Sequence, residues 1–225
     1  MRTVFIPRIA RTFRLMTALA IGPVLVGCAT PVPYDYTAFK QARPASMLVL
    51  PPLNETPEVI APYGVLSQVT LPLSEAGYYV IPVGLMDESF KQNGVVNPAE
   101  AHEISSEKLR EIFGADAAVL LKIKRYGTSY AVISSETTVA VEGKVVDLRT
   151  RQLLWQGSAQ ASSKEGEGGD QGGIVGLLIK AIVQQIVGTA TDASYMYAGR
   201  ASQRLLSPQK NGILYGPRSP NYQKD

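Results

Sequence analysis

The feature that most constrains this chain is its single cysteine, Cys28, which closes a basic and apolar N-terminal segment. Four arginines and no acidic residue flank or precede the apolar run at 15–26, and Leu25-Val26-Gly27-Cys28 resembles a bacterial lipobox. This layout is typical of a secretory signal peptide that is cut before a diacylated cysteine. We therefore expect residues 1–27 to be removed, with Leu25, Val26 and Gly27 recognised by the signal peptidase and Cys28 lipidated.

Two other interpretations of this segment stay open. One is a buried N-terminal helix ending in a free thiol, although Gly22-Pro23 would interrupt such a helix. The other is a secretory peptide that is cleaved elsewhere, which would leave an unpaired thiol in an oxidising compartment. Lipidation of Cys28 accounts for the thiol, and Ala29 in place of Asp after it favours the outer membrane over retention in the inner membrane.

The charge of the chain changes when the signal peptide leaves. The whole sequence has 22 Lys and Arg against 19 Asp and Glu, and four of the arginines lie before Cys28. The mature chain is therefore near neutral, with one excess negative charge, and gives no support to nucleic-acid binding. It also contains no further cysteine, which excludes disulfides, thiolate chemistry and cysteine-based metal sites.

Residues 28–45 are expected to form a tether, because they contain three prolines and no long apolar run. An alternative is that Tyr34, Tyr36 and Phe39 pack onto the domain, which would shorten the reach of the tether. The sequence leaves both open.

The first half of the mature chain predicts strands and helices in alternation. We expect strands at 46–53 and 78–83 and helices at 63–76, 85–92 and 99–113. Pro72 should kink the first helix, and Gly77 should cap it. Ser105 or Ser106 can cap the second half of the last helix, which Gly114 should end.

From residue 117 the pattern changes to strands, at 117–130, 137–148 and 153–162. In the middle run, valines alternate with Glu142 and Lys144, which predicts a sheet with one face in water. The short connection at 149–152 makes the last two strands antiparallel neighbours. The pattern predicts an α/β (α+β) fold over residues 46–206, a single three-layer-like domain with a mixed sheet of about five strands and flanking helices. An irregular tail should follow at 207–225.

A glycine-rich segment at 164–173 precedes an apolar run at 174–187 and a helical continuation towards Leu206. The glycine spacing fits neither phosphate-binding motif, and Glu165, Glu167 and Asp170 would repel a phosphate, so a flexible surface loop is favoured. The apolar run is too short and too polar to span a membrane. It is either a core helix or a subunit interface.

Few side chains suggest chemistry. His102, the single histidine, is flanked by acidic residues on an expected helix, which favours a solvated helix face. Glu107 and Glu111 are interspersed with basic residues, as on an exposed face, and Trp155 is expected in the core. The sequence therefore predicts no catalytic, cofactor-binding or metal-ligating residue.

Several segments resemble a family of uncharacterised Gram-negative lipoproteins that includes a meningococcal surface-antigen candidate. The segments that carry the resemblance are 47–54, 73–80, 88–94, 126–130 and 211–218, together with Gly114–Ala117 and Val146–Arg149. The resemblance implies a fold similar to the N-terminal domain of TolB, to the secretion lipoprotein CsgG and to LpoB, an activator of peptidoglycan synthases. It implies no established enzymatic activity.

The combined hypothesis is a lipid-anchored outer-membrane lipoprotein that catalyses nothing and acts as a scaffold or accessory subunit of a secretion or assembly complex. The expected partners are the membrane through the lipid, a second copy in a dimer, and other envelope lipoproteins, with CsgG-like proteins among them. One alternative is a regulator of a peptidoglycan-synthesis enzyme, as LpoB is. A third hypothesis is a periplasmic hydrolase, which loss of turnover in a His102→Ala variant would support.

Overall fold

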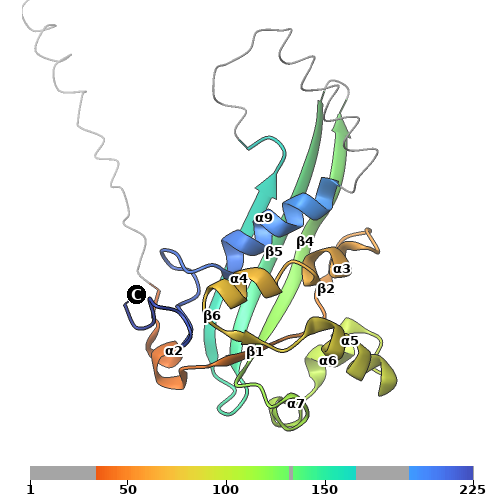
Figure 1. Cartoon of the computed structure of the whole chain (residues 1–225). Coiled ribbons are helices and arrows are strands. Elements are labelled where there is room, and N and C mark those ends of the chain that lie inside the picture. Colours follow the sequence, from red (N-terminus) through yellow and green to blue (C-terminus); the bar gives the residue numbers. More distant parts are fainter. Residues whose placement is uncertain (1–33, 132–133, 166–192, 225) are drawn as a thin grey trace, which may run out of the picture. The chain divides into compact units, whose positions relative to one another are not determined.

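A six-stranded mixed sheet runs through the part of the chain that the computed structural model describes, residues 34–131, 134–165 and 193–224 (Figure 1). Five strands follow the order β3-β1-β4-β5-β6, and β2 pairs separately with β4. The strands are β1 (Ser46–Val49), β2 (Leu53–Asn54), β3 (Tyr79–Val80), β4 (Ala117–Ala131), β5 (Ser134–Asp147) and β6 (Leu153–Ser162). β1 pairs in parallel with both β3 and β4, and β2 also pairs in parallel with β4. The pairs β4–β5 and β5–β6 are antiparallel. The expected mixed sheet with flanking helices is confirmed.

The sheet has one strand more than expected because the run at 46–53 is divided. Pro51 and Pro52 have no backbone N–H and interrupt the ladder between β1 and β2. Both pieces still pair with β4, at Met47↔Ala117 and Leu53↔Lys122.

Helices flank the sheet in two groups. They are α2 (Thr37–Ala42), α3 (Ala61–Leu66), α4 (Thr70–Glu75), α5 (Val83–Gln92), α6 (Pro98–Glu103), α7 (Ser106–Phe113) and α9 (Ala193–Leu206). α3, α4 and α9 lie on one side of the sheet, where α9 packs on β5 and β6 (Figure 1). α5 packs on β1, and α6 and α7 follow it.

Two expected helices are each divided, and both divisions have a local cause. The helix expected at 63–76 ends at Leu66 and restarts at Thr70, so that Pro72 lies in the first turn of α4, where its missing N–H is not needed. The helix expected at 99–113 is interrupted at Ser105. The Ser105 hydroxyl accepts a hydrogen bond from Lys108 N at 3.3 Å and so begins α7. Gly114 ends that helix in the left-handed conformation, as predicted.

The alternation predicted for β5 is confirmed. Val139, Val141 and Val145 are at most 1% exposed and face α9, whereas Glu142 and Lys144 are exposed on the opposite face. Trp155 of β6 lies in the same core, also as predicted. Glu142 and Lys144 thus give the face of the sheet opposite α9 an exposed polar part.

The segment expected to be a tether is described from residue 34. In this part the aromatic residues pack onto the domain, which is the alternative to a tether: Phe39 on α2 is 3% exposed, and Tyr34 and Tyr36 pack against the core. Tyr36 Oη donates to Gly212 O at 2.5 Å, so this segment also contacts the C-terminal tail. The tail is irregular but firmly packed, because Ile213 and Leu214 are buried. The domain thus includes residues that the sequence assigned to its two flanks.

Candidate protein-binding surface

The predicted lipidation site lies outside the described residues. The structure therefore does not place Leu25, Val26, Gly27 or Cys28. The apolar run at 174–187 and most of the glycine-rich segment also lie outside the described residues. Of that segment, Lys164 forms an ion pair with Glu136, and Glu165 forms one with Arg204 of α9.

His102 is not on a solvated helix face, which corrects the expectation from sequence. It is half-buried on α6, and its Nε2 lies 2.9 Å from Pro51 O. The contact arises because the interruption between β1 and β2 leaves the Pro51 carbonyl outside the ladder. Burial is the main cause that lowers the pKa of His102, with a smaller lowering from the charge of Lys122, whereas the hydrogen bond to Pro51 raises it.

His102 borders a shallow groove of about 540 Å³ on the open face of the sheet. Lys122, Glu142, Lys144, Gln156 and Ser158 line the groove with charged and polar side chains. Within the residues the structure describes, no three His, Cys, Asp or Glu side chains gather as a metal site would require. Glu107 and Glu111 are exposed on α7, as predicted, and Glu107 forms an ion pair with Arg151 in the β5–β6 turn. These side chains assemble no recognisable catalytic set.

The most open feature of the described chain is the far end of the β4–β5 hairpin. β4 loses its partner on one side after Ile123, whose carbonyl accepts the last such bond from Glu55 N at 3.0 Å. On the other side, the β5–β6 pairing ends at Thr138↔Ser162. Residues 128–131 and 134–137 therefore form a two-stranded ribbon that projects beyond the sheet (Figure 1). Among the described residues, the two strands of the ribbon pair in the sheet with each other only. Thr137 and Glu136 also bond to the segment at the end of β6, through Ser163 and through Ser162 and Lys164.

Charged side chains join β4 to the segment after β2, ahead of the ribbon. Glu55 follows β2 and forms ion pairs with both Lys122 and Lys124 of β4. The hydrogen bonds from Lys124 and then from Lys122 lower the pKa of the Glu55 carboxyl. The Thr128 and Thr137 hydroxyls also form a hydrogen bond across the two strands, at 2.8 Å. The edge at 128–131 pairs with no other described strand, and such an edge is a template for a further strand.

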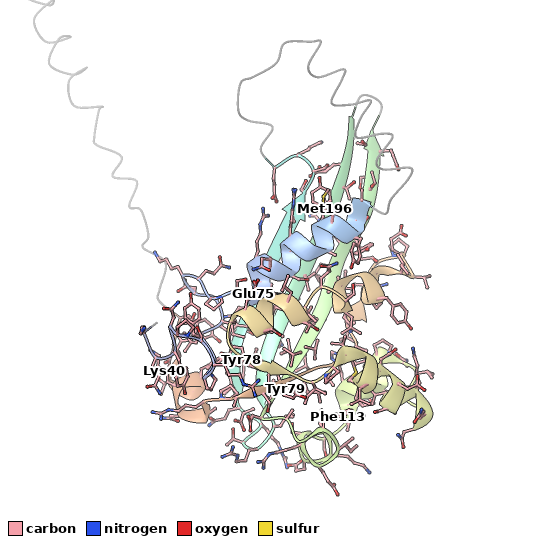
Figure 2. The ribbon with its side chains drawn as sticks, in the orientation of Figure 1. Lys40, Glu75, Tyr78, Tyr79, Phe113 and Met196 are labelled. Atoms are coloured by element: carbon pink, nitrogen blue, oxygen red, sulfur yellow. The ribbon has the colours of Figure 1, made fainter. Side chains whose placement is uncertain are left out.

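Exposed apolar side chains lie on the ribbon and on or next to two helices that contact the sheet, α3 and α9. Val59 and Ile60, just before α3, are 86% and 55% exposed, and Tyr63 on α3 is 53% exposed. α3 packs against α9, where Tyr195 and Met196 are each 48% exposed. Figure 2 labels Met196 on α9. Tyr130 on the ribbon itself is 85% exposed. These six residues and the unpaired edge at 128–131 are called the ribbon surface below.

The sequence alone did not indicate the ribbon surface. One available signal was length: the strand expected at 117–130 is far longer than the strands expected beside it at 46–53 and 78–83. A long strand between short neighbours must overhang them. The exposed apolar residues gave no such signal, because Val59 and Ile60 precede α3 and are not part of the apolar pattern of the expected helix.

Three comparisons relate the chain to known proteins. Residues 34–218 match a family described as "Putative lipoprotein GNA1162-like". The chain is 48% identical over 186 residues to "Putative lipoprotein NMB1124/NMB1162" of Neisseria meningitidis serogroup B, a match that covers 82% of this chain and 86% of that protein. It is also similar to the crystal structure of lipoprotein GNA1162 from Neisseria meningitidis, with a TM-score of 0.51, 46% identity, and coverage of 64% of this chain and 99% of the other.

Two solved structures with lower similarity to this chain support no conclusion about its function. A PelC dodecamer from Paraburkholderia phytofirmans has a TM-score of 0.44 at 13% identity, covering 74% of this chain and 89% of PelC. The LpoB C-terminal domain from Escherichia coli has a TM-score of 0.36 at 12% identity, covering 53% of this chain and 84% of that domain. In the described part of the chain, no helix has the length and hydropathy needed to cross a membrane.

The family match and the close meningococcal relative decide the assignment: the chain belongs to the GNA1162-like lipoprotein family.

Proposed function

We propose that this lipoprotein is anchored to the outer membrane through a lipidated Cys28 and that its domain works by binding another envelope protein. In this role it is a non-catalytic scaffold or accessory subunit of a secretion or assembly complex. The partner is another envelope lipoprotein, with CsgG-like proteins as the class that the sequence resemblance implies. The lipobox and the family support the anchor, and the ribbon surface supports the binding role.

The single observation that carries the binding role is the edge at 128–131, which pairs with no other described strand and carries the exposed Tyr130. Proteins usually protect such edges with charges, prolines or covering loops. Here Tyr130 is 85% exposed at the edge, and Ile60 lies in the neighbouring apolar group. An extended segment of a partner could add a strand to this edge by main-chain hydrogen bonds, while its side chains contact the apolar residues.

The same edge supports a dimer. Two copies could pair through their β4 edges, because an isologous contact uses the same patch on both subunits. Light scattering of the purified protein at several concentrations tests this part separately. A dimer that becomes monomeric with Tyr130→Asp supports pairing at the edge.

Site-specific photocrosslinking in cells tests the binding role. A photoreactive amino acid in place of Tyr130 should capture a discrete envelope protein, and the same residue in place of Glu111, which is exposed on α7, is the control. Ile60→Asp should weaken the crosslink at position 130 without unfolding the domain, because Ile60 is already 55% exposed. Equal crosslinking from positions 130 and 111 would contradict the assignment of the ribbon surface. Capture of a peptidoglycan synthase would instead support the regulator alternative.

A further inference from the structure

The helix α2 and the C-terminal tail lie together at the end of the domain where the described chain begins. Tyr34 N donates to Asn211 Oδ1 at 3.5 Å, and the Tyr34 hydroxyl accepts from Gln156 N at 3.2 Å. Tyr36 donates to Gly212 O. The point at which the chain leaves towards Cys28 is therefore fixed against α2, β6 and the tail. We call residues 34–45 together with 207–224 the basal surface.

A pocket of about 220 Å³ lies within the basal surface. Its inner wall is apolar and aromatic, because Phe39, Tyr78 and Leu214 line it and are at most 8% exposed. Lys40 and Arg43 also line the pocket and are exposed, so they lie at its mouth (Figure 2 labels Lys40 and Tyr78). Arg43 Nε donates to Lys40 O at 3.1 Å, and Arg43 has a left-handed backbone with φ of 47°. Two cations thus stand at the opening of a small aromatic cavity.

The charge of the basal surface differs from that of the rest of the domain. It contains five basic residues and one acidic residue, whereas the other described residues have 12 basic and 14 acidic residues. The five basic residues are Lys40, Arg43, Lys210, Arg218 and Lys224. The one acidic residue, Asp35, already accepts hydrogen bonds from Thr37 N and Thr37 Oγ1. Four half-buried tyrosines, Tyr34, Tyr36, Tyr215 and Tyr222, lie on the same surface.

Covalent geometry limits how far this surface can be from the lipid. This step rests on the proposed lipidation of Cys28. Six residue steps separate Cys28 from Tyr34, and a fully extended chain spans at most about 3.6 Å per residue. Whatever the conformation of the intervening residues, Tyr34 must lie within about 22 Å of the acylated residue. Tyr34 belongs to the basal surface, so the connection keeps at least this point of the surface within that distance of the acylated residue.

We propose that the basal surface faces the membrane and that the phosphate of an anionic phospholipid headgroup enters the pocket between Lys40 and Arg43. Guanidinium and ammonium groups are the usual partners of phosphate, and arginine binds it in a bidentate manner. Tyrosine is enriched at the level of the headgroups in membrane proteins. Basic residues near an anionic surface attract it electrostatically, with an energy that falls within a Debye length. The short connection allows the five cations to come within this range when the basal surface faces the membrane.

The proposal also orients the rest of the domain. β4 begins beside β1, whose first residue Ser46 adjoins the basal surface, and it ends at the ribbon. Twelve residues of strand separate Ala117 from Ser129, which is about 40 Å at 3.3 Å per residue. With the basal surface on the membrane, the ribbon surface is directed away from the bilayer and towards other proteins.

Fluorescence quenching in vesicles tests the proposal with the mature lipidated protein. Because the Cys28 thiol is acylated, a fluorophore can be attached to a single introduced cysteine, at Gln41→Cys on α2 or at Ser129→Cys on the ribbon as the distant control. Both positions are exposed. A headgroup-attached spin label should quench the fluorophore at position 41 strongly and the one at position 129 weakly. Quenching at position 41 should be stronger with phosphatidylglycerol present than in pure phosphatidylcholine.

Charge reversal tests the role of the pocket. The double variant Lys40→Glu/Arg43→Glu should lose the phosphatidylglycerol dependence, whereas Lys108→Glu/Arg110→Glu on the exposed α7 should keep it. In the unlipidated Cys28→Ser mature chain, the reversal at positions 40 and 43 should weaken binding to phosphatidylglycerol vesicles by at least about 30-fold, because each cation near the surface contributes a roughly fivefold attraction.

The outcomes separate this proposal from the anchor on which it rests. If the wild-type protein fails to float with vesicles, the lipid anchor is wrong, and the Cys28→Ser chain still tests the basal surface by itself. If the protein floats but positions 41 and 129 are quenched equally, the membrane-facing orientation is wrong. Interaction between labels at position 41 of two molecules, without quenching, would show that a second copy covers the basal surface and would overturn the proposal.

Discussion

Replacement of Gly77 by alanine tests how the C-terminal tail is held on the domain. Gly77 follows α4 with a φ of +97°, and the tail crosses directly over it. Gly216 N donates to Ala76 O at 2.8 Å, and Arg218 N donates to Gly77 O at 3.0 Å. A Cβ at position 77 would lie 2.4 Å from Ser219 N and 2.8 Å from Gly216 O. Both are backbone atoms, so the tail itself must move.

The expected loss of stability has three parts. A positive φ costs a non-glycine residue about 1 kcal/mol. The displaced tail loses two backbone hydrogen bonds, each with a net contribution of about 1 kcal/mol. The movement also disturbs the packing of Leu214, which is 8% exposed and whose carbonyl accepts a hydrogen bond from Tyr78 Oη at 2.6 Å. We therefore expect Gly77→Ala to lower the free energy of unfolding by about 3–5 kcal/mol.

Urea unfolding followed by circular dichroism and by tryptophan fluorescence measures this loss. Trp155 is the only tryptophan, and its indole N–H donates to Asn211 O at 3.1 Å, so its emission reports on the base of the tail. Gly94→Ala is the matched control, because Gly94 also has a positive φ, of +80°, but a Cβ added at that position would meet no neighbouring segment within 4 Å. It should cost only about 1 kcal/mol. Equal losses for the two variants would refute the account of the tail.

Three further predictions concern single side chains. Burial lowers the pKa of His102 in the folded state, so the unfolded chain binds a proton at this imidazole more readily than the folded chain does. The free energy of unfolding should therefore fall as pH decreases below about 6.5. Urea unfolding between pH 7 and 5 should show a weaker pH dependence in His102→Asn. Asp116→Ala should lower the free energy of unfolding by about 2–4 kcal/mol, because its carboxylate accepts three hydrogen bonds at the start of β1; Asp87→Ala, which loses only an exposed ion pair, should change it little. Ser105→Ala should cost about 1 kcal/mol through loss of the α7 cap, and Ser106→Ala should cost less, by thermal denaturation.

Much of the fold could be predicted from sequence because local signals decide it. The alternation around Glu142 and Lys144 placed β5 correctly, and the Ser105 cap and the Gly114 end of α7 follow from side-chain and backbone chemistry. The division of the helix at 63–76 was expected as a kink at Pro72. A proline is tolerated in the first turn of a helix, so the break lies before it.

The position of His102 could not be predicted, because its partner is the Pro51 carbonyl, 51 residues away. The same holds for Tyr36 and Gly212, which join the two ends of the described chain. The ribbon follows from the difference in length between β4 and its parallel partners. The sequence indicated the lengths, but only the strand pairing shows which strands are neighbours. Contacts between distant segments are thus what the local patterns leave out.

The most direct test of the account is the chemical state of Cys28 in the mature protein. Mass spectrometry of the protein purified from membranes should find a mature chain that begins at Cys28, with acyl chains on its N-terminal residue. The Cys28→Ser variant should carry no acyl label and should leave the membrane fraction. A mature chain that begins elsewhere, or a Cys28→Ser protein that stays in the membrane fraction, would contradict the lipid anchor.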